Sequence, residues 1–124
     1  MNLAVKLRKL NTNNNYLFMA FSGEEIRLVG SNYVVKNPSN DIQSANYIIN
    51  MDMVGRLKVD NTLAVYGMGT STRFKQVAHS ANKNFKFIEN ESGVGPSDHT
   101  LFYLNAIPVL HFFTGQHEYL SQAK

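Results

Sequence analysis

Runs of apolar residues separated by turn-forming residues divide the chain into strand and helix patterns. Continuous apolar runs of a few residues, bounded by glycine, proline or asparagine, indicate strands that are buried on both faces. Apolar residues that recur every three or four positions indicate amphipathic helices. The strands predicted in this way cover residues 16–21, 47–53, 62–66, 85–88 and 108–113.

The helical patterns fall between these strands and indicate a fold of the α/β class. Alternation of strands with helices favours a layered sheet, mixed but largely parallel, with helices on both faces. No internal repeat or linker composition divides the chain, so residues 1–124 are expected to form a single domain. The predicted helices cover residues 2–10, 24–37, 71–82 and 97–105.

Acidic side chains follow directly on predicted strands, where α/β sheets bind their ligands. Glu24 and Glu25 come after the first strand, Asp52 closes the second, and His117 and Glu118 trail the last. Parallel strands bring their carboxyl ends to one rim, so these side chains are expected to gather there. Such oxygen ligands suit zinc when imidazoles complete the shell, and magnesium or manganese when they do not.

The acidic residues also have structural interpretations. Glu24 and Glu25 would occupy a first helical turn, where the helix dipole favours carboxylates. Asp52 is harder to explain in this way, because it lies within an apolar strand and an unpaired buried carboxylate is costly. On spacing alone, Asp52 therefore indicates chemistry more strongly than the glutamate pair does.

Composition and charge narrow the classes of function. The 124 residues are 44% hydrophobic and 17% charged, and a net charge of +3 gives little electrostatic basis for nucleic-acid binding. No apolar run approaches the roughly 20 residues of a membrane helix. The absence of cysteine excludes disulfides, thiolate metal sites and cysteine nucleophiles. The basic start of the chain lacks the apolar core of a signal peptide.

Three blocks of sequence occur in a fixed order along the chain. They read FMAFSGEEIRLVGS at 18–31, INMDMVGR at 49–56 and SDHTLFYLNAIPVLHFFTG at 97–115. Together they resemble the di-zinc aminopeptidase family, which includes bacterial leucyl aminopeptidases and has glutaminyl cyclases and glutamate carboxypeptidases as relatives. The resemblance implies a zinc-dependent enzyme that hydrolyses the N-terminal residue of peptides.

The resemblance also implies a role for each matched residue. Glu24 matches the general base, which takes a proton from the water that bridges the two metals. Glu25 matches a carboxylate ligand of one zinc, and Asp52 matches a ligand of the other. Two cations about 3.5–4 Å apart would lower the pKa of the water and stabilise the tetrahedral intermediate.

The histidines and one further acid receive separate interpretations. Asp98 and His99 match the family's Ser-Asp-His block and are expected to lie near the site in a supporting role, with a helix cap or a satisfied helix histidine as the alternative for His99. His111 is interpreted as a core histidine and His79 as a surface residue. His117 matches the first histidine of the family's closing motif, which is not a ligand.

The chain departs from the family's pattern in its remaining ligands. In the family, a His-x-Asp histidine and a metal-bridging aspartate precede the helix with which this chain begins. Residues 1–23 of this chain contain no His, Asp or Glu. Leu120 or Ser121 stands where the last ligand would be. Glu25 and Asp52 are thus the matched ligands. The chain is expected to resemble the later part of a catalytic domain, with doubtful zinc occupancy and a sheet that is incomplete on its N-terminal side.

The favoured hypothesis is a metallo-aminopeptidase with a peptide substrate and neither a nucleic-acid partner nor a membrane segment. A catalytically inactive remnant or interaction domain of the same fold is the alternative that the missing ligands indicate. A glutaminyl cyclase-like activity is a further alternative, against which the absence of tryptophan counts. An exposed sheet edge would favour homo-oligomers. Relatives are often exported, and the compartment of this chain stays open.

Overall fold

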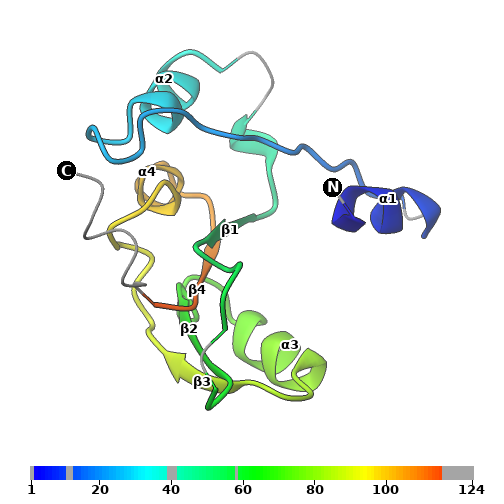
Figure 1. The fold of residues 1–124 in the computed structure, drawn as a ribbon. Coiled ribbons are helices and arrows are strands. Elements are labelled where there is room, and N and C mark those ends of the chain that lie inside the picture. The colour runs from blue at the N-terminus through cyan, green and yellow to red at the C-terminus, as the bar shows by residue number, and fades with distance from the viewer. Residues whose placement is uncertain (1, 11–12, 39–41, 58, 116–124) are drawn as a thin grey trace.

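The computed structural model describes residues 2–10, 13–38, 42–57 and 59–115, and Figure 1 shows how their elements are arranged. No helix in these ranges is long and apolar enough to cross a membrane. The elements are α1 (Asn2–Lys9), α2 (Val29–Lys36), the 3₁₀ helix η1 (Ile42–Ser44), β1 (Ile48–Asp52), β2 (Thr62–Tyr66), α3 (Phe74–Ala81), β3 (Lys86–Glu89), α4 (His99–Leu104) and β4 (Val109–Phe113).

The four strands form one open sheet in the order β1-β4-β2-β3. β1 is parallel to β4 and β2 is parallel to β3, whereas β2 and β4 meet antiparallel. β2, α3 and β3 form a parallel crossover unit, and β4 joins this unit to β1. The structure confirms the predicted α/β class with a mixed, mostly parallel sheet.

Alternation along the strands gives the sheet two faces, each with its own apolar core. We call them the α3 face and the α4 face, after the helices that cover them. On the α4 face, α2 packs beside α4. The α3-face cluster contains Leu63, Val65, Met68, Phe74 and Leu110, and the α4-face cluster contains Ile42, Phe102, Ile107 and Val109.

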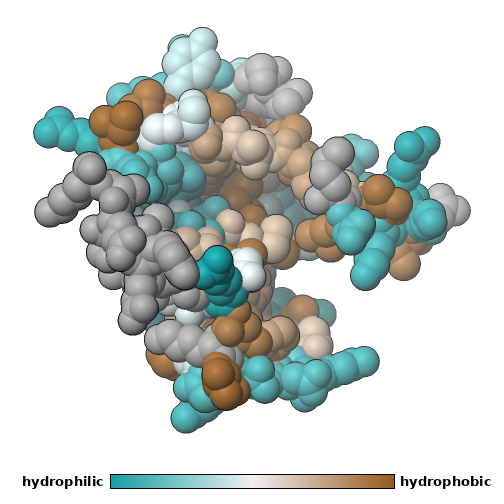
Figure 2. All heavy atoms as spheres, viewed as in Figure 1, coloured by the Kyte–Doolittle hydropathy of each residue, from teal (hydrophilic) through white to brown (hydrophobic). Residues whose placement is uncertain are grey.

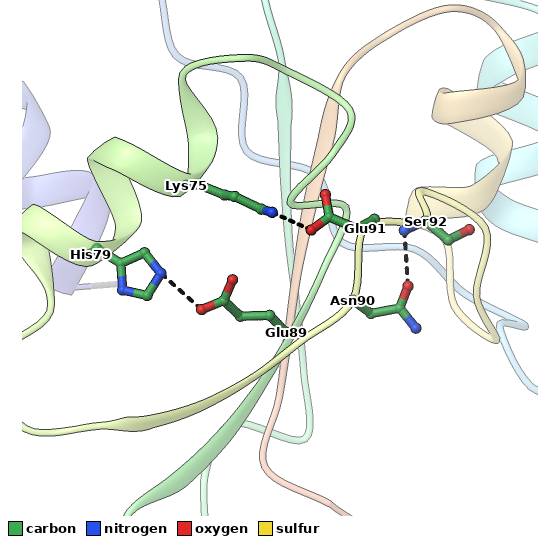
Figure 3. Close-up of polar contacts among 6 residues, drawn as sticks. All are labelled: Lys75, His79, Glu89, Asn90, Glu91 and Ser92. Atoms are coloured by element: carbon green, nitrogen blue, oxygen red, sulfur yellow. Dashed lines mark hydrogen bonds and ion pairs between the residues drawn. The ribbon is translucent and has the colours of Figure 1, made fainter.

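Two ion pairs link α3 to the end of β3, as Figure 3 shows. Lys75 pairs with Glu91, and His79 Nε2 lies 2.8 Å from Glu89 Oε1. His79 is thus a surface residue, as predicted. Exposed pairs of this kind contribute at most about 1 kcal/mol each, so apolar packing remains the main attachment of α3.

Helix α1 stands away from the sheet (Figure 1), and none of its residues is buried. Leu3 and Val5 are exposed, and so is Leu10 just beyond the helix. In the space-filling view, hydrophobic and hydrophilic residues both reach the surface of this helix (Figure 2). The predicted amphipathic helix is therefore present, but its apolar face packs on neither of the two described core clusters.

The apolar run at residues 16–21 is not a strand, which corrects the prediction. Met19 and Phe21 pack against the α4-face cluster, whereas Leu17 and Phe18 are exposed. A strand needs a neighbouring backbone to satisfy its N–H and C=O groups, and none of the described strands pairs with this run. An apolar composition alone does not supply that neighbour.

Helix α2 begins at Val29 and not at Glu24, which is a second correction. Arg27 and Leu28 have φ angles of 66° and 56°, a left-handed conformation that a right-handed helix does not contain. This reversal lets the Val29 N–H bond back to the Gly23 carbonyl at 3.0 Å. The glutamate pair therefore lies in a turn ahead of the helix.

Gly67 follows β2 at a point where the chain passes very close to β4. Its φ is +83°, and a Cβ there would lie 2.0 Å from the Val109 carbonyl oxygen. The Thr70 hydroxyl accepts the Val109 N–H at 3.0 Å and so holds the same contact from the next turn. This junction between β2 and β4 therefore admits no side chain at position 67.

Two histidines are stacked inside the α4 face. The rings of His99 and His111 have centroids 4.2 Å apart and planes 8° apart, and both side chains are fully buried. Neither nitrogen of His99 has a hydrogen-bond partner in the described part of the chain, whereas Asn50 contacts His111 Nδ1 at 3.0 Å. Burial, with a smaller effect of His111, lowers the pKa of His99 to about 4. Burial also lowers the pKa of His111, although Asp52 acts in the opposite direction.

Substituting Gly67 with alanine should weaken the fold strongly. The new Cβ collides with the Val109 carbonyl, and the left-handed backbone is unfavourable for alanine, so we expect a loss of about 2–4 kcal/mol in the free energy of unfolding. Urea denaturation measures this loss. Gly55→Ala is the matched control, because a Cβ there meets nothing within 4 Å. Equal stability of the two variants would contradict the close contact.

Acid should weaken the fold through the stacked histidines. The folded protein keeps His99 neutral, whereas an unfolded histidine titrates near pH 6.5, so the unfolded state takes up the proton first as the pH falls. The stability that His99 contributes above pH 6.5 is lost between pH 6.5 and about 4, by about 1.4 kcal/mol per pH unit. Urea denaturation across this range should show a flatter dependence for His99→Phe than for the wild type. An unchanged slope in the variant would count against the assignment.

Candidate active site

Glu24 and Glu25 occupy the turn between the extended run at 16–21 and α2. Gly23 opens this turn with a φ of 66°, and the Leu28 N–H bonds to the Glu24 carbonyl at 2.9 Å. Glu24 is half-buried and Glu25 is exposed. The two neighbouring carboxylates therefore have different surroundings.

Asp52 is the last residue of β1 and is half-buried. The next residue, Met53, has a left-handed backbone with a φ of 51°. Its carbonyl accepts a hydrogen bond from the hydroxyl of Thr114, a buried residue that directly follows β4. This bond joins the ends of the two parallel strands and holds the backbone beside Asp52 in an uncommon conformation.

Asp98 lies at the start of α4 and is buried. It makes no capping bond to its own helix. Its Oδ1 instead accepts the hydroxyl of the fully buried Ser31, from α2, at 2.5 Å. Asp98 therefore links α2 to α4, a side-chain contact that the apolar pattern of α2 did not predict.

Three carboxyl groups lie within electrostatic range of Glu24. Burial raises the pKa of Glu24, and the charges of Asp52, Asp98 and Glu25 raise it further, in that order of effect. These groups come from the turn before α2, the end of β1 and the start of α4. The structure thus brings together four of the residues selected from the sequence.

His99 and His111 continue this cluster into the core. The Asn50 side chain, two residues before Asp52, donates to Ser97 Oγ at 2.9 Å and contacts His111 Nδ1 at 3.0 Å. His111 is thus a buried core histidine, as expected. Asn50 was not selected from the sequence, although the signal that identified Asp52, a polar residue inside an apolar strand, applies equally to it.

The described residues do not fit a complete zinc site. They contain no group of three or more His, Cys, Asp or Glu side chains arranged to hold a metal ion. Catalytic zinc sites use about three protein ligands per ion, so Glu25 and Asp52 are too few by themselves. His117, Glu118, Leu120 and Ser121 lie outside the described residues.

Comparison with known proteins agrees with the three sequence blocks. The profile of peptidase family M28 matches residues 1–123. Searches of curated proteins and of solved structures found no match. The peptidases of this family are generally zinc-dependent hydrolases. Because the match extends over every described residue and all three blocks, the chain belongs to peptidase family M28.

Proposed function

We propose that this chain contributes the proton-accepting residue and two acidic ligands of a zinc-dependent aminopeptidase site. The observation that supports this most directly is the setting of Glu24, a half-buried residue. Burial, and after it the charges of neighbouring acidic groups, raise the pKa of its carboxyl. A base with a raised pKa holds an accepted proton more firmly than an ordinary glutamate does, and it can then act as an acid.

The proton transfers assigned to Glu24 follow from the chemistry of peptide hydrolysis. Glu24 takes a proton from a water molecule as the water oxygen forms a bond to the peptide carbonyl carbon. The same carboxyl then gives this proton to the amine nitrogen as the C–N bond breaks. We assign a supporting role to Asp98 and His99, since the Ser31 bond fixes Asp98 and the histidine stack fixes the start of α4.

The proposal assigns only two metal ligands. We assign Glu25 and Asp52 as ligands of one zinc ion each, on the basis of the resemblance of their sequence blocks to the di-zinc aminopeptidases. Two carboxylates are fewer than zinc requires, so the site needs additional donors from beyond the described residues or from another chain. Action on the N-terminal residue of peptides rests on the same resemblance.

A second candidate function is a non-catalytic domain of the same fold, with residues 1–124 as one domain. The observation that favours it is the lack of a metal-binding group of three or more side chains in the described ranges. In that case the Ser31–Asp98 and Asn50–His111 contacts would serve stability alone.

Replacing Glu24 with glutamine tests the proposed base. The amide keeps the shape of the side chain and cannot accept the proton, so kcat should fall by about 10²–10⁴-fold. The assay is hydrolysis of a chromogenic aminoacyl anilide in zinc-supplemented buffer. Glu91→Gln, at an exposed glutamate that pairs with Lys75, should retain wild-type activity. Wild-type rates in Glu24→Gln would rule out this residue as the base.

Zinc binding and activity in excess zinc distinguish the two candidate functions. Because two carboxylates hold zinc weakly, we expect well under two zinc ions per chain after dialysis, as measured by elemental mass spectrometry. In excess zinc, Asp52→Asn should bind less metal than the wild type, and Glu91→Gln should bind the same amount. Activity with added zinc supports the aminopeptidase. If the chain shows neither zinc binding nor activity in excess zinc, the non-catalytic domain is the remaining candidate.

A further inference from the structure

Asn50 is a polar residue in the middle of the apolar strand β1. Side chains alternate along a strand, so Asn50 lies on the α4 face between Asp52 and Ile48, which packs against the α4-face cluster. Its side-chain amide nitrogen donates to Ser97 Oγ at 2.9 Å and contacts His111 Nδ1 at 3.0 Å. Both protons of this nitrogen are therefore used inside the fold, one toward α4 and one toward β4.

The contact with Asn50 determines where His111 is protonated. An amide nitrogen only donates hydrogen bonds, so Nδ1 of His111 must accept one and carries no proton. The neutral ring then has its proton on Nε2. Burial, which lowers the pKa of His111, favours this neutral form. The stacked ring of His99 favours it too, because two adjacent imidazolium cations would repel each other.

The start of α4 connects this contact to α2. Ser97 is 2% exposed and is followed by Asp98, whose Oδ1 accepts the hydroxyl of Ser31 at 2.5 Å. The same hydroxyl lies 3.2 Å from the carbonyl oxygen of Leu28, at the end of the turn that carries Glu24. A path of side-chain hydrogen bonds, joined by the 97–98 peptide, thus runs from the sheet through the start of α4 to this turn.

Helix α2 and the turn before it form one closely packed unit. The Gly30 N–H bonds to the Ser22 carbonyl at 2.9 Å, and a Cβ at position 30 would lie only 2.7 Å from that carbonyl oxygen. The Val29 N–H bonds to the Gly23 carbonyl at 3.0 Å, across the base of the turn. Movement of α2 relative to the sheet would therefore move the turn, and Glu24 with it.

We propose that Asn50 is a positioning residue of the candidate site. Its amide holds His111 in the tautomer that is protonated on Nε2, and it ties β1 to the start of α4. Through the Ser31–Asp98 bond, this tie fixes the turn that bears Glu24. The inference deepens the proposed function and rests on it for the role of Glu24. A displacement of about 1 Å in a group that transfers protons can lower the rate about 10²-fold, so fixing the turn matters for catalysis.

A purely structural role for Asn50 has different consequences. Its bonds would then contribute only to stability, and their loss would loosen the fold as a whole or only the surroundings of β1. A positioning role requires two further effects. His111 must change its protonated nitrogen when the amide is replaced by a group that only accepts, and the disturbance must reach the turn that bears Glu24.

The first test is the tautomer of His111, measured by ¹⁵N NMR on the full chain labelled at histidine, at neutral pH. The signals lost in His111→Phe identify this ring. In the wild type, Nε2 should carry the proton and Nδ1 none. In Asn50→Asp the carboxylate only accepts, so Nδ1 should gain a proton. Asn105→Asp, the same change at an exposed asparagine that bonds to the Leu101 carbonyl, should leave His111 unchanged.

Amide hydrogen exchange tests whether the tie reaches the turn. Asn50→Leu removes both bonds and keeps the size of the side chain, and the Gly30 amide should then exchange about tenfold faster or more. The Asn90 amide, which bonds to the Val65 carbonyl on β2, should keep its rate. Ser31→Ala breaks the same path at a later contact and should give the same pattern.

Kinetics connect the tie to the proposed base. In the aminoacyl anilide assay, Asn50→Leu should lower kcat about tenfold or more and change KM little, because the substrate still binds while Glu24 is displaced. Asn105→Asp should keep both constants. An inactive wild-type chain would overturn the proposed function, but the tautomer and the exchange rates need neither metal nor turnover and still decide whether Asn50 places the turn.

Three results would overturn the proposal. They are a proton on His111 Nδ1 in the wild type, an unchanged His111 tautomer in Asn50→Asp, and exchange that rises as much at Asn90 as at Gly30 in Asn50→Leu. The last result would mean a general loss of stability. Circular dichroism shows whether each variant is folded. The wild-type tautomer needs no variant, so the proposal can fail even where a variant does not fold.

Discussion

The register of β4 against its two neighbours is the constraint on which the rest of the structure depends. β4 is parallel to β1 and antiparallel to β2, and it aligns Asp52 with Phe113 on one side and Tyr66 with His111 on the other. A shift by one residue would move every side chain of β4 to the opposite face. Leu110 would leave the α3-face core, and His111 would lose both its stack on His99 and its contact with Asn50.

Buried and partly buried polar contacts join this sheet to the acidic cluster. Asn50 contacts His111 across the β1–β4 pair, Thr114 holds the backbone after Asp52, and Ser31 holds Asp98. Buried polar groups that are fully satisfied make a structure specific, and those that are not reduce its stability. His99, with two unpartnered ring nitrogens, belongs to the second kind. The satisfied contacts thus support the candidate site, and the unpartnered His99 makes the core sensitive to acid.

Most of the helices and strands can be predicted from the sequence, and each wrong prediction has a physical cause. The strand at 62–66 is predicted by its apolar run and the helices at 71–82 and 97–105 by their helical patterns, because local patterns record how an element is buried. The run at 16–21 failed because a strand depends on a neighbour that its own composition does not reveal. The predicted start of α2 is wrong because Arg27 and Leu28 adopt left-handed backbones, and neither is glycine, the residue that would indicate such a conformation.

Predictions of the candidate site succeed and fail for similar reasons. Glu24 and Asp52 could be selected from their places after and within apolar runs, and the structure brings their charges within range of each other. Ser31 could not, because its partner Asp98 is 67 positions away in the chain. Asn50 carries the same signal as Asp52, but its contact with His111, 61 positions away, could not be predicted. Contacts across such separations depend on topology, which a single sequence does not specify.

The position of β4 in the chain has a consequence for folding during synthesis. β2, α3 and β3 are adjacent in sequence and can associate as soon as they leave the ribosome, but in the described sheet β1 is hydrogen-bonded to β4 and not to them. The β1–β4 pairing closes a separation of 61 residues, and contacts of this kind form late and slowly. Until residue 113 has emerged, β1 therefore lacks its β4 partner. During that interval a nascent chain is most prone to associate with other nascent chains on the same messenger RNA.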